Sequence, residues 1–256
     1  YLNVFSNKRG GLHRFKDWKK LFSVKQKQCC FVHSEDILDE CYEFKLNFDV
    51  VFCNSEYIKK RVKKRWGKDA RIILPLPTSD CVAEEKNEFS KYITFFNPTK
   101  LKGSDIIYEL IQRNPDRYFM IVLGWSCNLE FPEELNLSDK VLIIPPQQNV
   151  AEIYSYSRLV IVPSQWEEPF GRVMFEAAYN NIPVCVSEVG GMKQYFCNNG
   201  ILVKDYTNVS AWQDAIEKFD DTKFYNDVIQ NSVDLTKKYN LEEEYKKLFD
   251  ELKILI

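Results

Sequence analysis

The sequence has few of the residues and spacings that mark metal sites, disulfide frameworks or membrane spans. Its 256 residues include only two histidines, and its eight cysteines form no C-x-x-C pair. Most of these cysteines lie inside apolar runs, which favours buried thiols in a reducing compartment over disulfides or zinc ligands. No two aspartates have the D-x-D spacing that chelates a metal diphosphate. We therefore expect neither a metal nor another cofactor.

Long apolar segments and an excess of one charge are also absent. No stretch approaches the roughly 20 apolar residues of a membrane span, and no signal peptide is visible, which predicts a cytoplasmic protein without evident membrane contact. The chain starts at Tyr1 instead of methionine, which is compatible with a piece of a longer, multidomain chain. With 35 basic and 37 acidic residues, nothing favours nucleic acid as a partner.

Short β-branched runs alternate with amphipathic segments along the chain. Runs at 28–33, 49–55 and 70–77 are typical of buried strands, and a basic helix is expected at 56–67. From residue 91 the alternation becomes more regular. Near-continuous apolar strands between helices predict an α/β fold with parallel sheets covered on both faces. The strands expected in this part are 91–97, 118–125, 141–146, 159–164, 183–188 and 200–205, and the helices are 104–114, 150–157 and one after Gly171.

The polar segment 81–90 has no periodicity and is the best candidate for a linker. It predicts one domain at 1–88 and a second at 89–232. A helix at 240–256 repeats apolar residues at helical spacing behind Asn240, which can cap it. This helix is the candidate to join the first domain.

The most informative motif is PSQWEEPFGRVMFEAAYNNIPVCVSEVGG at 163–191, in which Glu168 and Glu176 bracket Pro169, Phe170 and Gly171. Proline suits a first helical turn, glycine lets backbone approach a ligand, and the unpaired N–H groups of the turn form an anion site. The motif resembles the donor-sugar motif of glycosyltransferase family 4, whose members are retaining, use nucleotide sugars and have the GT-B fold. The resemblance therefore implies two Rossmann-like domains of the GT-B type.

The resemblance implies that Glu176 binds the ribose hydroxyls of the nucleotide. It also implies that Glu168 and the backbone N–H groups near Phe170 and Gly171 hold the transferred sugar, because carboxylates accept charge-assisted bonds from hydroxyls. The alternative is that Glu176 only pairs with Arg172, one helical turn earlier.

A second segment, FFNPTKLKGSD at 95–105, places Lys102 and Gly103 between a strand and a helix. A lysine beside a helix N-terminus can hold a diphosphate and neutralise charge on a leaving nucleotide, although a solvated loop lysine is the alternative. The segment resembles a branch of family 4 that has asparagine-proline before its Lys-Gly. Most of the family has an arginine near Asn97, and Lys100 is the candidate to replace it.

A third segment carries Gly190 and Gly191 after an expected strand. The family usually has a glutamate where this chain has Gln194, so that contact is expected to be weaker or altered. A turn that needs positive φ would explain the two glycines equally well.

The first domain resembles only the later part of a family 4 acceptor domain and is therefore expected to be reduced. The run CCFVHSEDI matches a strand that ends in a histidine facing the donor sugar, which implies a role for His33, while a structural histidine is the alternative. Gly10 and Gly11 resemble the glycine loop of the family, but they lie too close to His33 for a full domain between them.

The resemblance implies a retaining, metal-independent hexosyl- or pentosyltransferase of glycan biosynthesis. Its donor would be a nucleotide-diphosphate sugar and its acceptor a glycan, a lipid or a protein-linked group. A nucleotide-sugar epimerase and a non-catalytic domain that binds nucleotide or glycan stay open as alternatives. The expected catalytic residues are His33, Lys102 and Glu168; the expected donor-binding residues are Asn97, Lys100, Lys102, Gly103, Glu168, Pro169, Phe170, Gly171, Arg172, Glu176 and Gly191.

Overall fold

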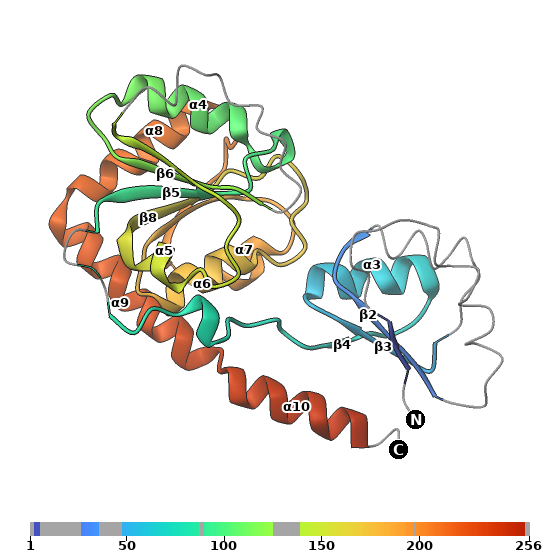
Figure 1. The fold of residues 1–256 in the computed structure, drawn as a ribbon. Helices are drawn as coiled ribbons and strands as arrows, with labels where there is room; N and C mark the ends of the chain where they lie inside the picture. The colour runs from blue at the N-terminus through green and yellow to red at the C-terminus, as the bar shows by residue number, and fades with distance from the viewer. Residues whose placement is uncertain are drawn as a thin grey trace. The chain divides into compact units, whose positions relative to one another are not determined.

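The computed structural model of the protein describes residues 3–5, 27–35, 48–85, 87, 90–124, 139–196 and 198–253. The chain forms two compact units (Figure 1). The first unit is Tyr1–Pro75 with Glu242–Ile256, and the second unit is Leu76–Leu241. The chain thus passes between units at Pro75 and Leu76, whereas the sequence placed the boundary at 88/89.

The first unit is built on a four-stranded parallel sheet in the order β1-β2-β3-β4. Its described elements are β1 (Asn3–Phe5), β2 (Gln28–Val32), β3 (Val50–Cys53), α3 (Glu56–Trp66), β4 (Arg71–Ile72) and α10 (Leu241–Lys253). Only two residues of the strand expected at 70–77 form β4. The Ile73 N–H still donates to the Cys53 carbonyl at 2.9 Å, but the Leu74 N–H donates to Glu244 Oε2 at 2.9 Å, and the prolines at 75 and 77 have no N–H to donate.

Successive residues of these strands face opposite sides of the sheet, and each side is covered by a helix. Cys30 and Val32 pack with Ile58 of α3, whereas Cys29 packs in a second cluster with Leu248 of α10. Burial on both sides explains why these strands are continuously apolar instead of alternating.

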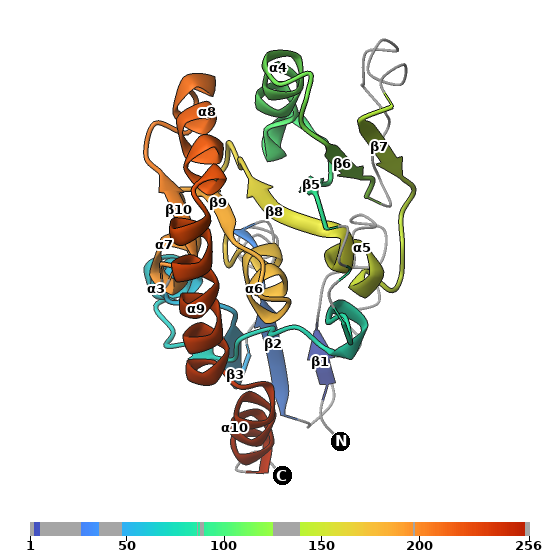
Figure 2. The same cartoon turned by 90° about the vertical axis from the view of Figure 1, so that its left-hand side faces the viewer.

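The second unit is built on a six-stranded parallel sheet in the order β10-β9-β8-β5-β6-β7, which runs from left to right in Figure 2. The two parallel sheets confirm the predicted α/β fold. The strands are β5 (Tyr92–Phe96), β6 (Phe119–Val122), β7 (Val141–Ile144), β8 (Ser157–Val162), β9 (Val184–Ser187) and β10 (Gly200–Val203).

Helices cover both faces of this sheet (Figure 1). On one face, Leu110 of α4 and Trp212 of α8 pack over Phe95 of β5. On the other face, Ile153 of α5 packs against β6, and α6 and α7 lie on the same side. The α-helices are α4 (Ser104–Arg113), α5 (Ala151–Tyr156), α6 (Arg172–Tyr179), α7 (Met192–Tyr195), α8 (Val209–Glu217) and α9 (Thr222–Lys238); short 3-10 turns are η2 (Ser79–Cys81), η3 (Lys100–Lys102) and η5 (Lys218–Asp220).

The short helix α7 has no counterpart among the expected elements, and neither do the two longer helices α8 and α9. Both carry sequence signals, because Asn208 and Asp221 accept hydrogen bonds from N–H groups of the first turns. Helix α9 also continues beyond residue 232, where the second domain was expected to end. Among the described residues, no helix is long and apolar enough to cross a membrane.

Candidate functional site

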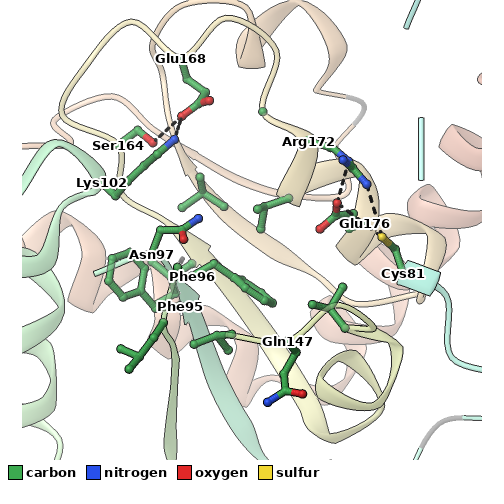
Figure 3. A pocket seen from close by; sticks show the side chains of 18 of the residues that line it. Cys81, Phe95, Phe96, Asn97, Lys102, Gln147, Ser164, Glu168, Arg172 and Glu176 are labelled. Carbon is green, nitrogen blue, oxygen red and sulfur yellow. Dashed lines mark hydrogen bonds and ion pairs between the residues drawn. The ribbon is translucent and has the colours of Figure 1, made fainter. Parts of the chain in front are cut away.

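A cavity of about 470 Å³ opens at the carboxyl ends of β5, β6 and β8 in the second unit (Figure 3). Ligands of open parallel sheets bind at this edge, because loops and helix N-termini converge there. The cavity wall includes the strand ends, the segment before α5, η2 and the start of α6. Its polar and charged lining residues are Asp80, Asn97, Lys102, Gln147, Gln148, Ser164, Glu168, Arg172 and Glu176.

One group of side chains is centred on the carboxylate of Glu168. Its Oε2 atom forms an ion pair with Lys102 and accepts hydrogen bonds from Ser164 Oγ at 3.2 Å and Trp166 Nε1 at 3.1 Å. The ammonium of Lys102 also lies 5.1 Å from the centre of the Trp166 ring. In the described part of the chain, Oε1 of Glu168 has no hydrogen-bond partner. This oxygen is therefore the one that can accept a bond from a ligand.

The N-terminus of α6 forms the adjoining wall. Gly171, Arg172 and Val173 line the cavity, and Gly171 has the left-handed φ of 83° that turns the chain into the helix. The N–H groups of a first helical turn have no carbonyl partner within the helix and carry the positive end of its dipole. This wall can therefore bind an anion.

A second group of side chains surrounds Glu176, which is 8% exposed. Tyr154 donates a hydrogen bond of 2.6 Å to Oε2, and Arg172 Nε lies 2.9 Å from Oε1. The Cys81 thiol points to Oε1 at 3.7 Å. The ion pair between Arg172 and Glu176, expected as the alternative to a binding role, is thus present. Glu176 also lines the cavity, so the ion pair does not exclude contact with a ligand.

Burial and charge fix which of these groups donate. Burial, followed by the charge of Glu176, raises the pKa of Tyr154 well above its usual value. The same two causes raise the pKa of the Cys81 thiol to about 11. Burial opposes the charged form of Arg172, but Glu176 and Cys81 outweigh it, so the pKa of this guanidinium is raised. All three side chains are therefore protonated donors toward Glu176 near neutral pH.

The two consecutive glycines hold the loop that carries Glu168. The Gly191 N–H donates to the Glu168 carbonyl at 2.7 Å, and the Gly190 N–H donates to Glu167 Oε2 at 2.8 Å. A Cβ atom on Gly191 would lie 2.0 Å from the Pro169 carbonyl oxygen. Gly191 thus packs behind the loop and is not part of the cavity lining.

The other predicted site residues have different positions. Lys100 is exposed and lies outside the lining, and Gly103 packs against Pro163, where a Cβ atom would clash. The buried ring of Phe170 stacks on Phe175 of α6, with the ring centres 4.7 Å apart, and is not part of the cavity lining. Pro169 is buried beside it.

His33 belongs to the first unit, where it follows β2 and its carbonyl accepts a hydrogen bond from Asn54 Nδ2 at 3.0 Å. Its role stays a prediction. Gln194 lies on α7, exposed and outside the cavity lining. Gly10 and Gly11 lie outside the described residues.

Four residues of the two groups around Glu168 and Glu176 were not selected from the sequence, nor were the lining residues Asp80, Gln147 and Gln148. Ser164 and Trp166 are inside the quoted motif, and their position after the β8 strand was a usable signal. Tyr154 and Cys81 gave no such signal, because each looks like an ordinary buried residue until its long-range partner is known.

The metal prediction is not tested by the geometry. Within the described residues, no group of three or more His, Cys, Asp or Glu side chains could hold a metal ion. Metal independence stays a prediction.

Comparison with known families identifies this architecture. The model of the family "Glycosyl transferases group 1" matches residues 83–234, which is more than half of the chain. The chain belongs to the group 1 glycosyltransferases. The matched region contains both groups of side chains around the cavity except Cys81.

Curated relatives of this group 1 chain are longer than the chain itself. It is 29% identical over 162 residues to the D-inositol 3-phosphate glycosyltransferase of Mycolicibacterium smegmatis, covering 58% of this chain and 35% of that protein. It is 22% identical over 247 residues to the putative glycosyltransferase YtcC of Bacillus subtilis, covering 81% of this chain and 58% of that protein.

Solved structures show the same fold at low identity. The sucrose-phosphate synthase of Thermosynechococcus elongatus has a TM-score of 0.77 at 19% identity and covers 94% of this chain and 71% of its own. HepE of Anabaena, solved in complex with UDP-glucose, has a TM-score of 0.79 at 15% identity. The match covers 91% of this chain and 74% of the HepE chain.

Proposed function

We propose that this protein is a family 4 glycosyltransferase that transfers a sugar, with retention of configuration, from a nucleoside-diphosphate sugar to a carbohydrate, lipid or protein-linked acceptor. The observation that carries the proposal is the cavity of the second unit. One hollow combines the Lys102 ammonium, the N-terminus of α6 and the carboxylates of Glu168 and Glu176. These are groups for a diphosphate and for hydroxyls.

The volume of the cavity supports a ligand of this size. Pockets for small molecules and cofactors usually enclose about 300 to 1,000 Å³. The cavity of about 470 Å³ lies within that range. The partly exposed apolar residues Phe96 and Val150 line part of it and can cover the flat face of a base.

Lys102 and the α6 N-terminus are proposed to bind the diphosphate. Lys102 is paired with Glu168 in the structure, so a diphosphate would compete for its ammonium. Its remaining partners would keep Glu168 in place, because Ser164 and Trp166 also donate to Oε2. Glu168 could then accept bonds from the sugar hydroxyls, while Lys102 and the helix dipole stabilise the departing diphosphate without a metal.

Glu176 is proposed to accept the two ribose hydroxyls. Its carboxylate faces the cavity although the residue is almost buried. A buried carboxylate is costly without partners, and Arg172 and Tyr154 provide them on opposite oxygens. This second unit would therefore be the donor-binding domain, and the first unit with His33 would be the acceptor side.

The named relatives support a nucleotide-sugar donor. The M. smegmatis relative is a D-inositol 3-phosphate glycosyltransferase, and HepE was solved with UDP-glucose. The chain spans 35% and 58% of the two curated relatives, so its acceptor and its activity as a whole protein are part of this proposal.

A panel of nucleotide sugars, incubated with and without candidate glycan acceptors, tests the proposal. Release of the nucleoside diphosphate with a glycosylated product is expected. Isomerised sugar still attached to the nucleotide would indicate an epimerase, and saturable binding without either product would indicate a non-catalytic module.

The same assay in excess EDTA tests metal independence. We expect undiminished transfer, because Lys102 and the α6 dipole can neutralise the diphosphate. Activity that EDTA abolishes and manganese restores would contradict this part of the proposal.

A further inference from the structure

Glu176 is held by an unusually complete set of donors for a residue proposed to bind a ligand. We infer that Tyr154 is a positioning residue: its hydroxyl fixes the carboxylate of Glu176 in the orientation that accepts two neighbouring ribose hydroxyls. This inference rests on the proposed function of Glu176. It assigns a role to a residue that would not itself touch the nucleotide.

The first argument is the burial of Tyr154. Its side chain is fully buried, and its hydroxyl lies 2.6 Å from Glu176 Oε2. Its ring packs against Phe96 at the end of β5, with the ring centres 5.2 Å apart. A side chain packed on all sides can hold its hydroxyl at one point, so it can fix the position of the oxygen that it contacts.

The second argument is the anchoring of α5, the helix that carries Tyr154. The Val150 N–H, just before α5, donates to the Asp80 carbonyl of η2 at 3.0 Å. Asn180, just after α6, donates to the Cys81 carbonyl at 2.7 Å. Three elements, α5, η2 and α6, are therefore joined by hydrogen bonds around Glu176.

The third argument is the geometry at the carboxylate. Tyr154 takes one acceptor position on Oε2, and Arg172 takes one on Oε1 at 2.9 Å. Each carboxylate oxygen can accept two bonds, and the thiol of Cys81 is only a weak donor. One acceptor position on each oxygen thus stays usable by a ligand, which suits a pair of adjacent hydroxyls.

Arg172 alone would not fix this orientation. Its side chain is 52% exposed, whereas that of Glu176 is 10% exposed, so the guanidinium can move in solvent and the carboxylate can follow it. The Tyr154 hydroxyl is the strong donor that solvent does not reach, since the buried Cys81 thiol is only a weak one. Removing it should let the carboxylate rotate while leaving the charge of Glu176 in place.

Tyr154→Phe tests the inference, because it removes the hydroxyl and keeps the ring. Tyr225→Phe is a matched control: Tyr225 is also buried, and its hydroxyl donates to the Arg158 carbonyl at 3.0 Å, at the other edge of the sheet. The ligands are the tightest binder among UDP, GDP and ADP, and its 2′,3′-dideoxy analogue. Calorimetry gives both affinities for each variant.

We expect the wild-type protein to prefer the ribonucleotide. Tyr154→Phe should weaken ribonucleotide binding about fivefold to tenfold, the equivalent of one hydrogen bond, and leave the dideoxy analogue unchanged. Turnover at saturating donor should change less than KM. Tyr225→Phe should leave both affinities unchanged.

Three outcomes would overturn the inference. An unchanged ratio of the two affinities in Tyr154→Phe would show that the hydroxyl does not orient Glu176, and an equal loss for both ligands would show a purely structural role. Equal binding of both ligands by the wild-type protein would instead refute the ribose assignment of Glu176.

A double-variant cycle keeps the test decisive if Tyr154→Phe is less stable. In a Glu176→Gln background, the Tyr154→Phe substitution should have no further effect on the preference for the ribonucleotide. A second, additive loss there would also contradict the inference.

Discussion

The two edges of the six-stranded sheet in the second unit carry similar charged residues, but these residues surround hollows of very different volume. At the carboxyl edge, Lys102, Glu168 and Glu176 line a cavity of about 470 Å³. At the amino edge, Arg117 forms two bonds to Asp220, and the Lys91 ammonium lies 3.7 Å from the centre of the Tyr118 ring. The hollow there measures only about 110 Å³.

The difference follows from the direction of the strands. In a parallel sheet the helix N-termini that follow the strands gather at the carboxyl edge, where their dipoles attract anions. Charged side chains pair with one another or lie near aromatic rings at both edges, as Lys102 does with Glu168 and Trp166, but at the amino edge they surround only the smaller hollow. A lysine or a carboxylate therefore indicates a binding site only when it also lies at the carboxyl edge of the sheet.

The largest difference between the two edges is expected in turnover when one lysine at each edge, Lys102 or Lys91, is replaced by alanine. Lys102→Ala should lower turnover about a hundredfold to a thousandfold, because it removes a preorganised cation from the leaving diphosphate. Lys91→Ala, at the amino edge, should leave turnover unchanged. Steady-state kinetics on both variants measures the contrast, and a Lys102→Ala enzyme within about threefold of wild type would make Lys102 a solvated loop residue.

A smaller effect is expected from two carboxylates that each pair with an arginine. Glu176→Ala should weaken nucleotide binding by roughly 1.5 to 3 kcal/mol, the value of hydrogen bonds to a charged group. Asp220→Ala removes the partner of Arg117 and should leave nucleotide binding intact. Calorimetry on folded proteins decides the matter: unchanged affinity in Glu176→Ala would refute its role.

The comparison extends to the first unit, where His33 follows the carboxyl end of β2. We expect His33→Gln to lower transfer about tenfold, the equivalent of one hydrogen bond to the sugar, while a nucleoside diphosphate without sugar binds as before. Transfer and nucleotide affinity should be measured on one preparation. Equal loss of both would mean that His33 supports the fold, and wild-type transfer would place the acceptor-side contact elsewhere.

Much of the fold could be predicted from the sequence, because buried parallel strands are short, nearly continuous apolar runs. β2, β3, β5 and β6 lie within the runs expected for them, whereas β8 begins two residues before its expected run at 159–164. The boundary between the domains has no such local signal. It depends on long-range packing, such as Leu248 of α10 against the cluster that contains Cys29.

The candidate site was predictable only where a local pattern exists. The motif around Glu168 and Glu176 selected the cavity, and Lys102 reached it as expected. Lys100, two residues earlier, is exposed outside the cavity, since the turn η3 sends neighbouring side chains in different directions. Tyr154 was missed because helical spacing predicts its burial but not the distant partner of its hydroxyl.

The smallest expected effect is on the free energy of unfolding of the protein, through an ion pair at the amino edge. The hydrogen bond from Arg117 holds the pKa of Asp220 below its usual value. A carboxyl group with a lowered folded pKa stabilises the protein above its unfolded pKa, about 3.9, and loses this contribution as the pH falls through the folded value. The Asp220 side chain is 55% exposed, so the contribution at pH 7 should not exceed about 1 kcal/mol.

Asp220→Asn removes this titration while keeping the size of the side chain. Urea unfolding should show the variant slightly less stable than wild type at pH 7, with the difference shrinking below about pH 4. Nucleotide affinity should be the same for both proteins. A stability difference that does not change with pH would mean that the ion pair is not its cause, and altered nucleotide affinity would mean that the amino edge also acts on the site.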